Sequence, residues 1–458
     1  MTEERRFRET HPWISFELNL ARLPWPLWVP LGEAQSKCEH LAGVPLPPKV
    51  AERLHKLYLA KGASATTAIE GNTLSEAEVV RLLEGKLKLP PSKAYLEREV
   101  RSVVDACNAI VQMCVRGNPR GLSPATIKNF NRLVLRGLPV DESTVPGETR
   151  RHQVGVARYR GAPPEDCEYL LEKLCEWLRG LRRNQSPVVF AILKAIVAHL
   201  YLAWIHPFGD GNGRTARLVE FYLLVEAGVP TPAAHLLSNH YNETRSAYYQ
   251  NLDASSRSGG DVAPFLEYAV QGFVDGLRAQ IAVVRQQQLQ VAWRDLIHET
   301  FRDSRSASAV RQRRLILDLS QREEPVEKDR IPRMTPRLAE AYASRTARTL
   351  SRDLEELKRM GLLEQVRRRY RATTEIIQAF LPMRREPFEG GDSTSTVREL
   401  PSSISPHRHE CVDCGRPYDC VCDDPEERLT KKEAEARGVP VRCPACEVAE
   451  SSPRMLAS

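Results

Sequence analysis

The sequence predicts a mainly helical protein that carries only a few short β-hairpins. Apolar residues follow a helical spacing in most segments between residues 50 and 360, and Ser, Thr or Pro at the start and Gly at the end frame several of them. Two stretches, residues 149–159 and 362–373, lack that spacing and indicate hairpins. Six of the eleven cysteines gather beyond residue 410. We therefore expect a helical main body followed by a small cysteine-rich tail.

Length and charge set broad limits on the kind of protein. At 458 residues the chain has room for about three domains, and its net charge of +7 permits a nucleotide or nucleic-acid partner without requiring one. The apolar segment 187–205 approaches the length of a membrane span, but Lys194 and His199 interrupt it, so we expect a core helix and no membrane association. No apolar stretch follows the charged N-terminus, which argues against a secretory signal. Five scattered cysteines and six near the C-terminus fit a reducing cytoplasm with one local metal site better than a disulfide framework.

Residues 206–217 concentrate the groups that a phosphate site needs. Three glycines at alternate positions allow positive φ angles, so main-chain N–H groups can turn inward as an anion nest. An apolar run from residue 218 predicts a helix that begins near residue 212, whose N-terminal amides would face the same anion. The segment also supplies an imidazole before a proline, a carboxylate suited to Mg²⁺, and two guanidiniums on one helical face. These residues are His206, Asp210, Gly211, Asn212, Gly213, Arg214 and Arg217.

This segment, HPFGDGNGRTAR, resembles the active-site motif HxFx(D/E)GNGRxxR of the Fic (filamentation induced by cAMP) family at every fixed position. The resemblance implies a helical Fic core that transfers AMP from Mg·ATP to a Ser, Thr or Tyr hydroxyl of a protein. It implies His206 as general base, Asp210 as the Mg²⁺ ligand, and the glycine turn as the cradle of the α- and β-phosphates. Arg214 and Arg217 would bind the outer phosphates. The plain alternative is a glycine-rich loop before a buried helix.

A second short pattern lies upstream, where Thr66 and Glu70-Gly71 fit the family's inhibitory pattern (S/T)xxxE(G/N). The resemblance implies an inhibitory helix at about residues 62–72 whose Glu70 pairs with Arg217. A bidentate pair would occupy the arginine that the γ-phosphate needs and would add negative charge there. Taken alone, the same residues also fit a helix that ends at a glycine with Glu70 in solvent. Some self-restrained relatives also remove AMP with this glutamate, so a de-AMPylase activity stays open.

Two further segments have counterparts in the family. The hairpin at about 149–160 resembles the flap, which aligns a protein substrate by adding it as a β-strand, although a plain connecting hairpin fits the same residues. The segment 237–252 resembles the stretch beside the nucleotide base. Tyr249 is the candidate for the adenine pocket, and Tyr248 is expected to face the core. Some relatives carry Asn where this chain has Ser256, which puts the adenine contact in doubt.

Beyond residue 302 a different module is expected. Helices at 310–319, 335–342 and 344–360, followed by a basic hairpin at 362–373, resemble a winged helix-turn-helix. Arg345, Arg348 and Arg352 follow one side of the third helix, and DNA binding through residues 303–383 is one interpretation. The other is a winged helix that serves dimerisation or docks a protein. A homodimer is left open.

The C-terminal tail contains two CxxC pairs, the ligand type that a tetrahedral structural zinc site needs. The expected Zn²⁺ ligands are Cys411, Cys414, Cys443 and Cys446. The gap between the pairs is longer than usual, and Cys420, Cys422, His407 or His409 could replace one pair or form a second site. A redox pair is the alternative, although no thioredoxin-like pattern surrounds it.

These observations predict the following domain organisation and function. The segments are an N-terminal helical region (1–120), the Fic core (121–280), a connector helix (281–302), the winged helix-turn-helix (303–383), a linker (384–406) and the zinc-binding tail (407–450). The expected function is protein adenylyltransfer that uses ATP and Mg²⁺ and is inhibited by Glu70. A DNA-binding transcriptional regulator whose Fic core senses nucleotide is the alternative from another class.

Overall fold

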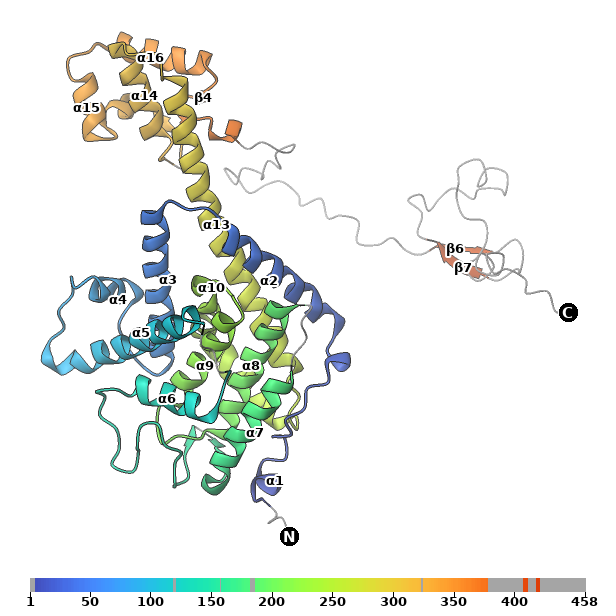
Figure 1. Ribbon diagram of the computed structural model, residues 1–458. Helices are drawn as coiled ribbons and strands as arrows, with labels where there is room; N and C mark the ends of the chain where they lie inside the picture. Colours follow the sequence, from blue (N-terminus) through green and yellow to red (C-terminus); the bar gives the residue numbers. More distant parts are fainter. Residues whose placement is uncertain are drawn as a thin grey trace. The chain divides into compact units, whose positions relative to one another are not determined.

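The computed structural model describes residues 5–117, 121–156, 158–181, 186–322 and 324–377, and the strands at 407–410 and 417–420. The chain divides into two compact units, residues 1–379 and 380–458. In the second unit, β6 (His407–Glu410) pairs antiparallel with β7 (Pro417–Cys420). The first unit is mainly helical, as the sequence predicts, and holds the candidate site (Figure 1).

The N-terminal region consists of helices with recognisable start signals. Pro48 stands in the first turn of α3, where a missing N–H is tolerated, and Ser75 with Glu78 forms a capping box at the start of α4. The elements are α1 (Phe7–Thr10), η1 (Leu20–Arg22), α2 (Trp25–Gly43), α3 (Pro48–Ile69), α4 (Glu76–Leu83), η2 (Pro91–Lys93) and α5 (Ala94–Val115).

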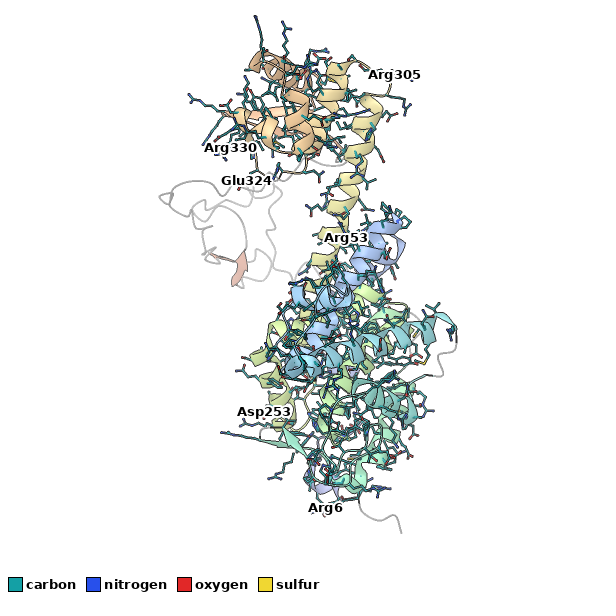
Figure 2. The ribbon with its side chains drawn as sticks, turned by 90° about the vertical axis from the view of Figure 1, so that its left-hand side faces the viewer. Arg6, Arg53, Asp253, Arg305, Glu324 and Arg330 are labelled. Carbon is teal, nitrogen blue, oxygen red and sulfur yellow. The ribbon has the colours of Figure 1, made fainter. Side chains whose placement is uncertain are left out.

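Helix α3 differs from the sequence-based expectation. We expected an inhibitory helix at about 62–72, but most of these residues belong to a longer helix, α3, which is continuous from Pro48 to Ile69. Gly62 lies inside this helix and is needed for packing, because a Cβ there would overlap the His235 side chain. Near the start of α3, Arg53 lies beside α13 and donates to Gln287 at 3.3 Å (Figure 2).

The centre of the first unit is a predominantly apolar helix, α8. Fifteen of its 19 residues are buried, and it packs closely against α9. By length and composition α8 could cross a membrane, but 83% of its apolar window is buried inside the fold, as expected of a core helix. The elements around it are α6 (Pro124–Val134), β1 (Gly155–Val156), β2 (Tyr159–Arg160), η3 (Pro164–Asp166), α7 (Cys167–Gly180), α8 (Pro187–Ile205), α9 (Asn212–Glu226), α10 (Thr231–Ala234), α11 (Leu236–Glu243) and α12 (Arg245–Arg257).

The connector helix is much longer than expected. It belongs to α13, a continuous helix of 38 residues from Ala263 to Thr300, so the expected boundary at residue 280 falls inside a helix. Gly272 and Gly276 do not end it, because the side chains of His240 and Leu236 pack where their Cβ atoms would be. The first half of α13 contributes to the main core, and its last turns contribute Trp293 and Ile297 to a second core.

The second core belongs to a module of three helices and a small sheet. Buried Asp353 of α16 ties the helices together by accepting from Arg311 and Gln312 of α14 and from Tyr342 of α15. The sheet has the order β3-β5-β4, and the sequence did not reveal its first strand. The elements are α14 (Ala307–Leu319), β3 (Val326–Glu327), η4 (Lys328–Arg333), α15 (Pro336–Tyr342), α16 (Ala347–Arg359), β4 (Leu363–Val366), β5 (Arg369–Ala372) and η5 (Thr374–Ile377).

Candidate active site

The loop between α8 and α9 has a geometry set by its own residues. His206 ends α8 in the left-handed region (φ 50°), where it is one of few non-glycine residues in the described part of the chain. Gly211 (φ 74°) then leads into α9. The Asn212 side chain accepts from Phe208 N–H at 2.9 Å and donates to Phe208 C=O at 2.8 Å, which closes the turn on itself. The loop is therefore held in shape before any ligand binds.

The amino end of α9 faces a carboxylate of this chain. The space directly above Gly213 is taken by Glu70, because a Cβ added to this glycine would overlap Glu70 Oε1. Glu70 itself caps the C-terminus of α3. A helix N-terminus with free amides favours an anion, and here the anion is a side chain from a segment distant in the sequence.

Arg217 binds the same carboxylate. Its side chain is only 1% exposed, and its Nη2 donates to Glu70 Oε1 at 2.5 Å and to Thr66 C=O at 3.0 Å. Burial by itself would raise the pKa of Glu70, but the positive charge of Arg217, its hydrogen bond and the charge of Arg214 together lower that pKa. The expected pairing of these residues is thus present, but as one N–O contact and not as the expected bidentate pair.

Arg214 lies on the same side of α9 but binds other carboxylates. Its Nη1 donates to Glu99 Oε1 of α5 at 2.9 Å and its Nη2 to Asp210 Oδ1 at 3.2 Å. The sequence did not reveal Glu99, since nothing in the periodic pattern of α5 distinguishes it from a surface glutamate. The shared face of the two arginines was predicted correctly, and each arginine has its own acidic partner.

His206 has the properties of a neutral base. Burial lowers its pKa from 6.5 to about 4, so the ring is uncharged at neutral pH. Its Nδ1 lies 3.4 Å from the Ala203 carbonyl oxygen, which can only accept, so this nitrogen carries the proton. The lone pair is then on Nε2, which leaves that nitrogen free to take a proton from a substrate.

Arg150 holds this histidine and was missed by sequence reasoning. The side chain is buried (4% exposed), and its Nε donates to the carbonyl oxygen of His206 at 2.7 Å. The other nitrogens donate to the carbonyls of His152 (2.9 Å) and Ala162 (2.5 Å). It therefore joins the residues on both sides of the hairpin to the end of α8. Its only signal in the sequence is an arginine just before a segment without helical spacing.

The expected flap is a short antiparallel hairpin in which Gly155 pairs with Arg160 and Val156 with Tyr159. The Tyr159 hydroxyl donates to the Trp204 carbonyl at 2.8 Å, which anchors the hairpin on the last turn of α8. Gly161 lies so close to His206 that a Cβ would overlap that side chain. The hairpin thus begins and ends beside the base.

The tyrosines after the motif divide as expected. Tyr248 is buried and its hydroxyl lies 2.8 Å from His199 Nε2, whereas Tyr249 is 43% exposed and its hydroxyl reaches the Ile69 carbonyl at 3.5 Å. Tyr249 is therefore next to Glu70. The Ser256 hydroxyl is engaged with its own helix, since it donates to the Asp253 carbonyl at 2.9 Å.

Asp210 fits a role as a Mg²⁺ ligand. One of its oxygens accepts from Gly211 N–H (2.5 Å) and from Arg214, while the side chain as a whole remains 49% exposed. Magnesium in nucleotide sites is commonly held by one or two carboxylates together with phosphates and water. The predicted zinc ligands Cys411, Cys414, Cys443 and Cys446 lie outside the described residues.

These features define a helical domain in which an imidazole base, an anion nest and two buried arginines meet at one helix mouth. Residues 121–224 match the model of the Fic/DOC family. The matched segment contains α6 to α8, the hairpin and nearly all of α9, and it includes every residue of the motif. The chain therefore contains a Fic/DOC domain.

Curated relatives are similar to the chain over a longer stretch. The chain is 31% identical over 206 residues to protein adenylyltransferase fic-1 of Caenorhabditis briggsae and of Caenorhabditis elegans, which covers 45% of this chain and 38% of each relative. The chain thus spans well under half the length of these relatives. Among solved structures, a Fic family protein from Desulfovibrio desulfuricans G20 is similar at 21% identity and a TM-score of 0.48, covering 78% of this chain and 98% of that one.

Proposed function

We propose that this protein transfers AMP from ATP to a hydroxyl group of a protein. The observation that carries the proposal is the position of a neutral His206 beside the amino end of α9, where Arg214 and Arg217 also converge. The proposal is also supported by similar proteins that are named protein adenylyltransferase. A base, an anion nest and two guanidiniums are what in-line attack on a nucleoside triphosphate requires.

The proposed reaction is a balanced nucleotidyl transfer. His206 Nε2 takes the proton of a Ser, Thr or Tyr hydroxyl, and the oxygen forms a bond to the α-phosphorus of ATP. The bond from this phosphorus to the β-phosphate bridge breaks, and pyrophosphate leaves. The amides of α9 and the two arginines stabilise negative charge that moves onto the leaving group. Mg²⁺ bound at Asp210 would contribute further neutralisation of the phosphates.

The test uses ATP labelled separately at the α- and γ-phosphates. Label from the α-phosphate should appear on protein, and label from the γ-phosphate should not, because AMP is transferred. His206→Ala should abolish the signal, and the matched control His40→Ala, an exposed histidine on α2, should leave it unchanged. Equal α-labelling by wild type and His206→Ala would refute the proposal, as would transfer of the γ-phosphate.

The arrangement of Glu70 supports autoinhibition as part of this function. Its carboxylate lies over Gly213 at the amino end of α9 and binds Arg217, so it occupies a position suited to a phosphate. Productive ATP binding would then require Glu70 to leave. The same residue, close to His206, is also able to orient a water molecule, and this is the basis for removal of AMP as an additional activity.

The hairpin β1–β2 is proposed to align the protein substrate. β1 has a strand partner on one side only within the described part of the sheet, which leaves its other edge for a substrate segment. Arg151, Arg158 and Arg160 are exposed here, and they line a cavity of about 1260 Å³ together with Gly161. Their charge favours a target with acidic residues near its hydroxyl.

DNA binding by residues 307–377 is a second proposed function. Three helices, with a hairpin and the extra strand β3, are the parts of a winged helix-turn-helix. Arg348 and Arg352 are exposed on one side of α16, whereas Arg345 precedes this helix, which begins at Ala347 and not at residue 344 as expected. No carboxylate of the described chain lies within ion-pair distance of these three arginines. A duplex-binding assay over a salt series tests this, since affinity should fall steeply with salt.

The remaining proposals concern the tail and the setting of the protein. The two CxxC pairs of the sequence support one structural Zn²⁺ bound by Cys411, Cys414, Cys443 and Cys446. Metal analysis after dialysis against a weak chelator should find about one zinc per chain. A cytoplasmic location is proposed from the cysteine usage alone, and size-exclusion chromatography with light scattering would decide between monomer and homodimer.

A further inference from the structure

A second cavity lies outside the Fic/DOC domain, against the C-terminal half of α13. It has a volume of about 450 Å³ and is bounded by α13, α14 and α15. Residues that line it recur at spacings of three and four on α13 and on α14, so each helix turns one face toward it. Its wall includes Trp293, Arg294, His298, Arg313, Arg314 and Arg337.

The charge around this cavity is of one sign. Four arginines line it and no carboxylate does. Arg337 is neutralised by the buried Asp318 behind it, through a hydrogen bond from Nε at 2.9 Å. For Arg294, Arg313 and Arg314, no acidic oxygen in the described chain lies within 4 Å of a guanidinium nitrogen. Arg294 and Arg314 are exposed and Arg313 is half-buried, so water partly screens their charges, and an anion bound between them would offset their repulsion.

Trp293 gives an independent indication of a ligand. Its side chain is only 2% exposed, and its indole nitrogen is buried without a hydrogen-bond partner. An indole N–H can only donate, and a buried donor without an acceptor is unfavourable. Trp293 lines the cavity, so an oxygen atom of a bound molecule that came within reach of this nitrogen would supply the missing acceptor. The indole ring and Leu317 also provide apolar surface for a non-polar part of that molecule.

We propose that this cavity binds a small phosphorylated molecule of about nucleotide size. Its volume is within the roughly 300–1,000 Å³ typical of small-molecule sites and is too small for a folded partner. Guanidinium groups match phosphate oxygens in two-point contacts, which favours phosphate over a single carboxylate. The site is independent of the proposed AMP transfer, because none of its residues belongs to the Fic/DOC match.

The test is fluorine NMR of the full chain with 5-fluorotryptophan at its six tryptophan positions. The Trp293 signal is assigned from its loss in Trp293→Phe, and the probes are inorganic phosphate, pyrophosphate and AMP, each titrated separately. We expect a saturable shift of this signal with pyrophosphate or AMP. Trp293 is the only tryptophan among the residues that line this cavity. Probes that bind at the amino end of α9 therefore do not contact Trp293 and do not shift its signal directly.

Arginine variants then locate the ligand. Arg294→Gln and Arg314→Glu should each weaken the titration at least tenfold, and the matched control Arg285→Gln, an exposed arginine of α13 outside the cavity, should not. Thermal unfolding should show that each variant is folded. Three results would overturn the proposal: no shift of the Trp293 signal with any probe, a shift caused by duplex DNA alone, or an unchanged titration in both cavity variants.

Discussion

Replacing Glu70 with glycine is expected to raise self-labelling by ATP, and the size of the effect follows from one contact. Arg217 donates to Glu70 Oε1 at 2.5 Å, and ATP must break this interaction before its outer phosphate can bind Arg217. A hydrogen bond to a charged group contributes about 1.5–3 kcal/mol, which corresponds to about a 10- to 150-fold change in affinity. Glu70 keeps 33% of its side-chain exposure, so solvent screening favours the lower part of that range.

The assay measures two quantities in wild type, Glu70→Gly and Glu70→Gln. The first is the dissociation constant of a non-hydrolysable ATP analogue with Mg²⁺, and the second is the initial rate of α-phosphate labelling. The free Glu70→Gly variant should also melt at a lower temperature, because buried Arg217 then retains only the Thr66 carbonyl as a hydrogen-bond partner within the described chain, whereas glutamine keeps an acceptor oxygen. ATP should restore more stability to Glu70→Gly than to wild type.

A matched control separates this contact from a general loss of charge. Glu76→Gln removes an exposed carboxylate of α4 that forms only a surface ion pair with Lys61 at 3.6 Å. This variant should behave as wild type. If Glu70→Gly and Glu70→Gln bind the analogue and label no better than Glu76→Gln, the carboxylate over α9 does not compete with ATP, and the reasoning from the contact is wrong.

Three other outcomes are expected. Arg150→Lys keeps the charge but loses the fork that binds four carbonyls, so kcat should fall at least tenfold while the affinity for the ATP analogue changes little. Because the pKa of His206 is lowered to about 4, kcat/KM should not decline as the pH falls through 6.5, and its decrease in acid should appear near pH 4. Burying the neutral ring also makes the free energy of unfolding depend on pH, so this part of the stability should be lost as the pH falls from 6.5 to about 4. Arg311→Met removes the guanidinium that neutralises the buried Asp353 carboxylate. It should lower the free energy of unfolding of residues 307–377 by about 3 kcal/mol in urea denaturation, and an unchanged midpoint would contradict this.

The sequence was most informative where geometry depends on neighbouring residues. Gly211 and Asn212 shape the turn between α8 and α9 through their own backbone angle and side-chain hydrogen bonds, so the start of α9 could be predicted at residue 212. The proline after His206 likewise indicated the end of α8 correctly. Apolar composition identified α8 as a core helix despite its length.

The sequence was least informative where glycine serves packing. Gly62, Gly272 and Gly276 look like interruptions, yet α3 and α13 continue through them because a neighbouring side chain fills the space beside each. A one-dimensional pattern cannot distinguish a glycine that ends a helix from one that admits a neighbour. α3 and α13 each extend beyond the segments that the sequence predicts.

The sequence by itself therefore determined the chemical groups of the site and the local shape of the loop that carries them. Only the tertiary structure decided which charges meet: that Glu70 lies over Gly213 and makes a single contact with Arg217, that Glu99 binds Arg214, and that Arg150 holds His206. The reason is physical. Turn and helix signals act between residues a few positions apart, whereas the pairing of buried charges depends on how distant helices pack, and no local pattern records that.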